Sequence, residues 1–307
     1  MEKVIVVIGP TSVGKTKMGV ALAKKFNGEV ISGDSMQIYK QMDIGTAKVT
    51  EEEKEGIIHH CVDILNPDET YSVHDFQQTV RKKITEITQR GHVPIIVGGT
   101  GLYIKAALYD YQFDEMENDH HAINEKYKDD TKEQLHDHLK SIDEESAKIL
   151  HFNNRRRVLR AIEIYETTGK RKSEMLEEQE HICLYDAYFV GLTLPRDVLY
   201  ERINKRVDVM MENGLKEEMD CLYSQGLTRN HQSMKAIGYK EWFDYYDHQI
   251  DLNDVLELIK KHSRQYAKRQ YTWFKNQFDV HWYDVNLENF EQTIEQVTDD
   301  IEKILKV

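Results

Sequence analysis

Short apolar runs alternate with amphipathic segments over the first third of the chain. The apolar runs lie at 4–8, 30–31 and 93–97. Between them, apolar side chains recur at helical spacing, at Met18, Leu22 and Phe26 and again at Phe76, Val80, Ile84 and Ile87. Such a spacing is typical of an amphipathic helix, and a short uninterrupted apolar run is typical of a strand buried on both faces. The pattern predicts an α/β fold in which helices cover a parallel sheet.

This alternation stops in the middle of the chain. Residues 112–183 have the pattern of polar helices, strand character returns over 184–194, and the chain after Pro195 is helical in pattern nearly to its end. One helix there has an apolar face made of Leu199, Ile203, Val207 and Met210, and it stops at Asn213 and Gly214. We expect a core of residues 1–111 and 184–307 with a helical C-terminal part, and a helical insertion domain of residues 112–183.

Charge is distributed unevenly along the 307 residues. The formal net charge of −13 argues against a protein that binds nucleic acid over its whole surface. Residues 110–146 hold thirteen acidic side chains against four lysines, whereas residues 258–278 hold six basic side chains and no acid. Residues 151–172 are also basic, with seven Lys or Arg against two acids. Any contact with a polynucleotide must therefore be local, and a solvated helix face explains the same charges equally well.

The sequence has no segment that predicts secretion or membrane insertion. The apolar run at 4–8 is far too short to cross a bilayer, and Glu2 and Lys3 leave no room for a secretory segment. Cys61, Cys183 and Cys221 are too widely spaced for a disulfide framework or a zinc ribbon. We expect a cytoplasmic protein with reduced cysteines and no membrane contact.

A phosphate-binding loop follows the first apolar run. It reads Gly9-Pro10-Thr11-Ser12-Val13-Gly14-Lys15-Thr16 and matches the pattern GxxxxGK[ST] between a predicted strand and a predicted helix. In such a loop the backbone N–H groups and the helix N-terminus surround phosphate oxygens, Lys15 adds a positive charge and Thr16 can hold Mg²⁺. The loop does not show which bond breaks, so a nucleotide kinase or an NTPase is the default interpretation.

Four further residues could take part in chemistry. Asp34 follows a strand, where its carboxylate could accept a proton, although an Asp there could also cap a helix. Thr100 follows Gly98 and Gly99 after another strand, in what is either a ligand-binding segment or an ordinary turn. Arg202 and Arg206 are four residues apart on one side of a helix and could clamp a diphosphate or simply face solvent.

Taken together, these motifs resemble those of the tRNA dimethylallyltransferases of the bacterial type. The resemblance extends over nearly the whole chain, through residues 32–39, 42–48, 97–103, 153–163, 202–214, 235–240 and 266–274. It implies a P-loop NTPase-like core, with a helical insertion that reaches the anticodon arm. It also implies transfer of a dimethylallyl group from dimethylallyl diphosphate to N6 of adenine 37 in tRNAs that read U-starting codons, with release of pyrophosphate.

The resemblance also assigns roles to individual residues. Asp34 matches the general base, Thr100 a reaction-centre residue and Arg206 the donor-binding arginine, with the diphosphate held by residues 9–16 and Mg²⁺ at Thr16. The positions that match tRNA-contacting segments are Asp34, Ser35, Met36, Gln37, Thr100, Arg156, Arg157, Val158, Leu159, Arg160, Lys235, Ala236, Ile237, Gly238, Tyr239 and Lys240. We expect a monomer whose partners are dimethylallyl diphosphate and the anticodon stem-loop of tRNA.

Two other functions remain open from the residues alone. A small-molecule kinase would use ATP in the phosphate-binding loop and Asp34 as the base for a hydroxyl acceptor, and it would release ADP. An RNA-binding NTPase without transferase activity would hydrolyse nucleotide and retain RNA binding after loss of Asp34. The prenyltransferase interpretation predicts pyrophosphate instead.

Overall fold

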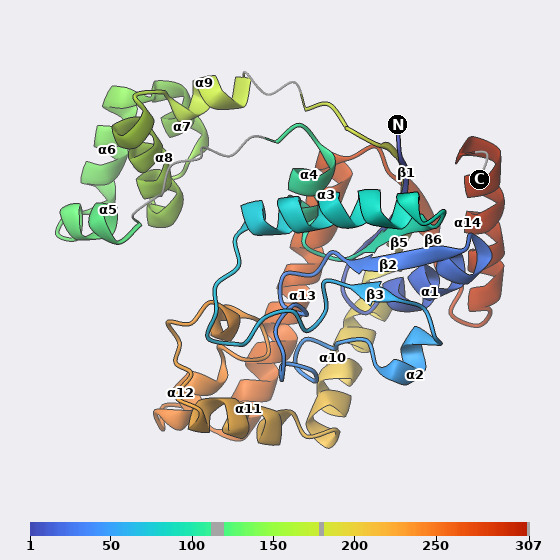
Figure 1. Ribbon diagram of the computed structural model, residues 1–307. Helices are drawn as coiled ribbons and strands as arrows, with labels where there is room; N and C mark the ends of the chain where they lie inside the picture. Colours follow the sequence, from blue (N-terminus) through green and yellow to red (C-terminus); the bar gives the residue numbers. More distant parts are fainter. Residues whose placement is uncertain (112–119, 178–180, 306–307) are drawn as a thin grey trace. The chain divides into compact units, whose positions relative to one another are not determined.

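The computed structural model describes residues 1–111, 120–177 and 181–305 (Figure 1). The chain divides into two compact units. The first, here called the core unit, comprises Met1–Tyr109 and Cys183–Val307, and the second, the insertion unit, comprises Asp110–Ile182. Among the helices described, none combines the length and the apolar character needed to cross a membrane.

A six-stranded parallel sheet forms the centre of the core unit, as the apolar pattern predicts. The strands lie in the order β3-β2-β4-β1-β5-β6. Their bounds are β1 Lys3–Ile8, β2 Gly28–Ser32, β3 His59–His60, β4 Val93–Val97, β5 Asp186–Thr193 and β6 His281–Asp284. The predicted strands in the first third and after residue 184 are confirmed. The two edge strands β3 and β6 were not predicted, and β6 interrupts the expected helical C-terminal part.

Helices bury both faces of this sheet (Figure 1). Alternate residues of β1 belong to different apolar clusters: Val6 packs with α3 (Val73–Gln89), whereas Val7 packs with α1 (Lys15–Lys25) and α14 (Phe290–Leu305). This alternation follows from the two-residue repeat of a strand. Because both faces are covered, the strands need to be apolar throughout, which explains the uninterrupted runs in the sequence.

The remaining helices of the core unit surround the carboxyl ends of the strands. They are α2 Glu51–Lys54, α4 Gly101–Leu108, α10 Arg196–Glu212, α11 Leu215–Ser224, the 3₁₀ turn η1 Ser233–Lys235, α12 Trp242–Tyr246 and α13 Leu252–Gln277. The helix predicted between Pro195 and Gly214 is confirmed as α10, which packs against α13.

The insertion unit is helical throughout its described secondary structure. Its helices are α5 His120–Lys126, α6 Lys132–Ile142, α7 Glu144–Ile149, α8 Arg155–Thr168 and α9 Lys172–Glu177. It has an apolar core of its own, in which Leu139 of α6 packs with Val158 and Ile162 of α8. The unit spans 110–182, against a predicted 112–183, and residues 112–119 and 178–180 of that prediction lie outside the described residues.

This small separate core gives a prediction for stability. Leu139 is completely buried, and its replacement by Ala should cost about 2–5 kcal/mol of the unit's free energy of unfolding, because a cavity replaces the side chain. We expect hydrogen exchange to show lost protection over α6 and α8 with β1 and β4 unchanged. Lys140→Ala, on the exposed side of the same helix, is the matched control. Equal loss of protection in β1 and β4 would contradict an independent core.

Candidate active site

The phosphate-binding loop has the strand–loop–helix geometry expected of it. Gly9 follows β1 with φ +146°, and Gly14 precedes α1 with φ +104°, backbone conformations that residues with a Cβ rarely adopt. At Gly9 a Cβ would also lie 2.6 Å from the carbonyl oxygen of Leu192. The loop is therefore restricted to glycine at both ends, and it leads directly into the N-terminus of α1, where the helix dipole favours an anion.

Two cations lie close together beside this loop. Burial lowers the pKa of Lys15 to about 7, with a further contribution from the positive charge of Arg206, and the carboxylate of Asp34 opposes both effects. Burial likewise lowers the pKa of Arg206. In the absence of an anion, the Lys15 ammonium donates a hydrogen bond to the carbonyl oxygen of Pro10, at 2.8 Å. A phosphate group here would give both cations a negatively charged hydrogen-bond acceptor.

Helix α10 contributes both arginines that the sequence singled out. The Arg206 guanidinium donates to the hydroxyl of Thr11 at 3.1 Å, and the Arg202 guanidinium donates to the carbonyl oxygen of Ser12 at 3.0 Å. Arg202 is exposed, whereas Arg206 is half-buried. The structure thus places both side chains against the phosphate-binding loop, and only Arg206 points into partly buried space.

Asp34 and Thr100 lie together at the carboxyl ends of β2 and β4. No helix begins at Asp34; one carboxylate oxygen accepts the N–H of Met36 at 2.8 Å in a local turn. The Thr100 hydroxyl accepts the N–H of Ser35 at 3.1 Å and donates to the Ser35 hydroxyl at 3.3 Å. These contacts fix the Asp34 segment to the loop after β4.

The two strand ends approach so closely that only glycine fits between them. A Cβ at Gly98 would lie 2.3 Å from the backbone carbonyl carbon and oxygen of Gly33. The N–H of Gly33 donates to the carbonyl oxygen of Val97 at 2.8 Å, and the N–H of Thr100 donates to the carbonyl oxygen of Gly33 at 3.2 Å. The glycines at 98 and 99 are therefore more than an ordinary turn, because one of them permits the contact that joins the two loops.

Two adjoining cavities open onto these residues. The larger, of about 750 Å³, is lined by the phosphate-binding loop with Lys15, Thr16 and Gly99. The smaller, of about 340 Å³, is lined by Met36, by residues 235–238 and Lys240, and by apolar side chains of α10. Residues common to both linings are Thr11, Ser12, Asp34, Thr46, Arg206 and Met210. Asp34 and Arg206 therefore stand where the two cavities meet.

Helix α13 supplies two residues that received no role from the sequence. Gln270 accepts the N–H of Thr11 through Oε1 and donates to the carbonyl oxygen of Gly99 through Nε2, both at 3.0 Å. The Tyr266 hydroxyl donates to the same carbonyl oxygen at 3.3 Å, and burial raises its pKa to about 12, so it stays protonated. Gln270 thus links the phosphate-binding loop to the loop after β4. The signal available in the sequence was a polar residue one helical turn from Tyr266.

The predicted tRNA-contacting residues divide into exposed and buried ones. Arg156 and Arg157 are exposed, and Arg160 pairs with Glu163 at 2.8 Å. The side chains of Val158, Leu159 and Tyr239 are instead buried in apolar clusters. The apolar repeat of α8 places Val158 and Leu159 in the core of the insertion unit, whereas Tyr239 lies in a turn of the core unit. That these positions belong to tRNA-contacting segments stays a prediction.

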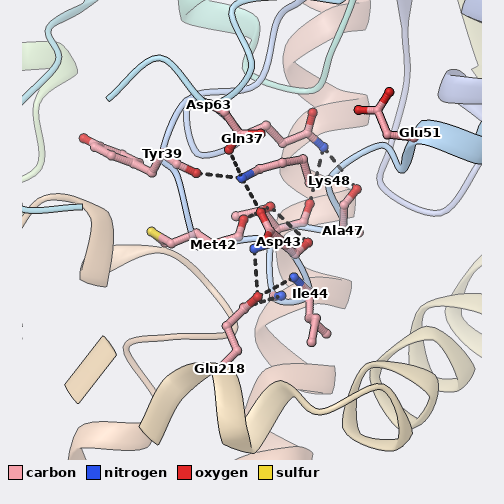
Figure 2. A network of polar contacts seen from close by, with 12 residues as sticks. Gln37, Tyr39, Met42, Asp43, Ile44, Ala47, Lys48, Glu51, Asp63 and Glu218 are labelled. Carbon is pink, nitrogen blue, oxygen red and sulfur yellow. Dashed lines mark hydrogen bonds and ion pairs between the residues drawn. The ribbon is translucent and has the colours of Figure 1, made fainter. Parts of the chain in front are cut away.

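Gln37 also turns toward the protein. Its Oε1 accepts from the hydroxyl of Ser32 at 3.2 Å, and its Nε2 donates to the carbonyl oxygens of Ala47 at 3.2 Å and Thr46 at 3.4 Å (Figure 2). Gln37 consequently connects the end of β2 with the segment 43–47, which lines the larger cavity in part.

Comparison with known proteins identifies the family. Residues 37–277 match the model of the IPP transferase family. The chain is 55% identical over 289 residues to a tRNA dimethylallyltransferase of Bacillus cereus strain AH187, covering 92% of this chain and 90% of that protein. It is 54% identical to the tRNA dimethylallyltransferase of Bacillus anthracis, with 92% and 91% covered.

Solved structures agree with these matches. The full-length tRNA isopentenylpyrophosphate transferase of Bacillus halodurans superimposes with a TM-score of 0.77 at 45% identity, covering 100% of this chain and 97% of that chain. A eukaryotic dimethylallyltransferase acting on tRNA gives a TM-score of 0.86 at 33% identity, with 99% and 79% covered. The core is thus of the P-loop NTPase-like type, and these relatives are prenyl transferases, which excludes the kinase alternative. The chain belongs to the IPP transferase family, the tRNA dimethylallyltransferases.

Proposed function

We propose that this chain transfers a dimethylallyl group from dimethylallyl diphosphate to N6 of adenine 37, beside the anticodon, in tRNAs that read U-starting codons. The products are N6-(dimethylallyl)adenosine and pyrophosphate. The observation that supports this most directly is the position of Asp34, a potential base, beside Lys15 and Arg206 at the junction of two cavities. A nucleophile and a diphosphate ester could meet there from opposite sides.

The transfer forms a carbon–nitrogen bond, breaks a carbon–oxygen bond and moves one proton. N6 of the adenine attacks C1 of the dimethylallyl group, the bond from C1 to the diphosphate oxygen breaks, and the diphosphate leaves with the electron pair. N6 gives up a proton, which the carboxylate of Asp34 accepts. One Asp34 oxygen is already held by the Met36 N–H, so the carboxylate has a fixed orientation before substrate arrives.

Negative charge accumulates on the diphosphate as it leaves. Lys15, Arg206 and the N–H groups of the phosphate-binding loop are the groups that stabilise it, and their partial burial strengthens each interaction. Thr100 is anchored to Ser35 and lies beside the Asp34 segment, where its hydroxyl can hydrogen-bond the reacting groups. Lys15 lines only the larger cavity, whereas Asp34 and Arg206 line both, so the proposed base and one cation stand where donor and acceptor would meet.

Magnesium suits the donor side of this site. Thr16 lies in the first turn of α1 and lines the larger cavity with Lys15. In the part of the chain that the structure describes, no group of three or more His, Cys, Asp or Glu side chains could hold a metal. Mg²⁺ usually keeps several waters and binds through few protein groups together with substrate phosphates, so a site with the Thr16 hydroxyl is compatible with it. Bound there, Mg²⁺ would neutralise charge on the diphosphate.

The acceptor side suits a single base taken out of its stack. The smaller cavity is large enough for an unstacked base, and Lys235 and Lys240 lie at its wall. The exposed Arg156 and Arg157 of the insertion unit supply charge for the phosphates of the anticodon stem-loop. We further propose that the protein works in the cytoplasm as a monomer.

The direct test is incubation of the purified protein with dimethylallyl diphosphate, Mg²⁺ and unmodified tRNA. Nucleoside mass analysis should detect N6-(dimethylallyl)adenosine with an equal amount of pyrophosphate. A tRNA with guanosine at position 37 should accept nothing. RNA-stimulated nucleotide hydrolysis without either product would instead indicate an RNA-binding NTPase.

Replacement of Asp34 by Asn distinguishes the role of the carboxylate as a base from its role in the local turn. The Asn oxygen can still accept the Met36 N–H, but the side chain cannot take a proton. We expect single-turnover rates to fall about 10²–10⁴-fold, with the Kd for tRNA unchanged in filter binding. A variant that transfers at the wild-type rate would remove Asp34 from the mechanism.

The two arginines of α10 form a matched pair, since each substitution by Ala removes one positive charge near the same loop. Arg206→Ala should raise the Kd for dimethylallyl diphosphate about 10- to 100-fold, because charged hydrogen bonds to the diphosphate are lost. Arg202→Ala should have a smaller effect, since Arg202 is exposed. Isothermal titration calorimetry measures both, and equal effects would argue against a special role of Arg206.

The lowered pKa of Lys15 predicts that the protein takes up a proton when the donor binds. Its pKa of about 7 in the free protein means that it is largely neutral at pH 8, and a bound diphosphate raises that pKa by favouring the charged form. Donor affinity should therefore fall as the pH rises above 7. Calorimetry at pH 8 in buffers of different ionisation enthalpy should show uptake approaching one proton, absent in Lys15→Met. Equal enthalpies in all buffers would contradict the lowered pKa.

A further inference from the structure

The carboxylate of Glu218 receives four hydrogen bonds from two segments that line the cavities. Three come from consecutive backbone N–H groups, those of Asp43 at 2.8 Å, Ile44 at 2.7 Å and Gly45 at 3.0 Å (Figure 2). The fourth comes from the hydroxyl of Tyr239, at 2.6 Å. Convergence of successive N–H groups on one anion is the arrangement of an anion-binding nest, here filled by a side chain of α11.

Tyr239 contacts Glu218 through its hydroxyl and Gly45 through its ring. Its side chain is completely buried, and burial followed by the charge of Glu218 raises its pKa well above the usual value, so the hydroxyl remains a donor. A Cβ at Gly45 would lie 2.5 Å from the Tyr239 ring, so the loop can approach only because residue 45 is glycine. Glu218 thus joins the 43–47 segment to the 235–240 segment. At this junction the Tyr239 ring packs directly against Gly45.

The other side of the 43–47 segment is fixed by Lys48. The Lys48 side chain is only 5% exposed, and its ammonium donates to the carbonyl oxygen of Tyr39 at 2.7 Å and pairs with the carboxylates of Asp43 and Asp63 (Figure 2). Gln37 binds the carbonyl oxygens of Thr46 and Ala47 from the same side. The segment is therefore fixed on both sides. The carboxylate of Glu218 accepts its N–H groups, and the Lys48 ammonium and the Gln37 amide donate to its oxygens.

This clamped segment forms a wall shared by both cavities. Thr46 lines both, together with Asp34 and Arg206, and Gly45 lines the smaller cavity beside Gly238. The affinity for each substrate has other sources, since the phosphate-binding loop holds the diphosphate and surface cations hold tRNA phosphates. The wall can therefore govern alignment of donor and acceptor without contributing much to binding.

We propose that Glu218 is a positioning residue for prenyl transfer, which sets the wall that aligns the acceptor base with the donor. This rests on the proposed function. Glu218 touches neither substrate; it acts through the 43–47 segment and Tyr239.

Glu218→Gln tests this with little change in size. A carboxamide has one acceptor oxygen, and its NH₂ group would face N–H donors, so at least one backbone N–H loses its partner. We expect the single-turnover rate to fall about tenfold or more, because misalignment of reacting groups is costly. The Kd values for dimethylallyl diphosphate and tRNA, and the stoichiometry of donor binding, should remain those of wild type. Measurements are made well below the unfolding temperature.

Glu217→Gln is the matched control, since it removes the same charge from the neighbouring exposed position. It should behave as wild type, and prenylation by wild type and by this control establishes the function independently of Glu218. A Glu218→Gln rate equal to that of Glu217→Gln would overturn the proposal. So would a fall in rate matched by an equal loss of binding stoichiometry, which would indicate a merely unfolded fraction.

Tyr239→Phe provides a second route that does not depend on the folding of Glu218→Gln. It removes one of the four hydrogen bonds and retains the ring that packs on Gly45. The transfer rate should fall by less than in Glu218→Gln, again with unchanged Kd values. In the double variant the two losses should not add, because both act through the same carboxylate. An unchanged rate in Tyr239→Phe would contradict the role given to this pair.

Discussion

Two desolvated cations and one carboxylate meet at the carboxyl edge of the sheet, and the remaining features of the site depend on their balance. Burial lowers the pKa of both Lys15 and Arg206, the positive charge of Arg206 lowers that of Lys15 further, and the carboxylate of Asp34 opposes these shifts. Two buried positive charges close together are unfavourable without an anion. Binding of a diphosphate would therefore relieve this repulsion and favour the charged forms of both side chains. In the proposed reaction, the same cations would stabilise the negative charge of the leaving diphosphate.

The loops that hold this cluster are fixed by helices far away in the sequence. Gln270 of α13 bridges the phosphate-binding loop and the loop after β4, and Arg202 of α10 holds the phosphate-binding loop at Ser12. Glu218 of α11 fixes the 43–47 segment in the same way. In each case a side chain pairs with backbone groups that regular secondary structure leaves open. The loops are thereby preorganised, although they are not part of the sheet.

Glycine permits two approaches that the site requires. At Gly98 a Cβ would meet the backbone of Gly33, and at Gly45 it would meet the ring of Tyr239. The first contact brings Asp34 next to Thr100, and the second brings the cavity wall next to the 235–240 segment. These are close backbone approaches, and their need for glycine arises from neighbours that are distant in the sequence.

Features that arise between neighbours along the chain could be predicted from the sequence. The phosphate-binding loop, β1, β2, β4 and α10 were all predictable, because a strand, a helix or a P-loop is formed by contiguous backbone and by an apolar repeat. The short edge strands β3 and β6 were not, since two and four residues of mixed polarity have no such repeat. Their places after strands and on one side of a helix made Asp34, Thr100 and Arg206 candidates, and the family resemblance assigned their roles. Tertiary structure alone decided that Tyr239 is buried and that Gln270 and Glu218 hold the loops. A polar residue on a helix occupies the same place in the sequence pattern whether its side chain faces solvent or binds a distant backbone segment. Which of the two occurs is decided only when the helix packs against the rest of the chain.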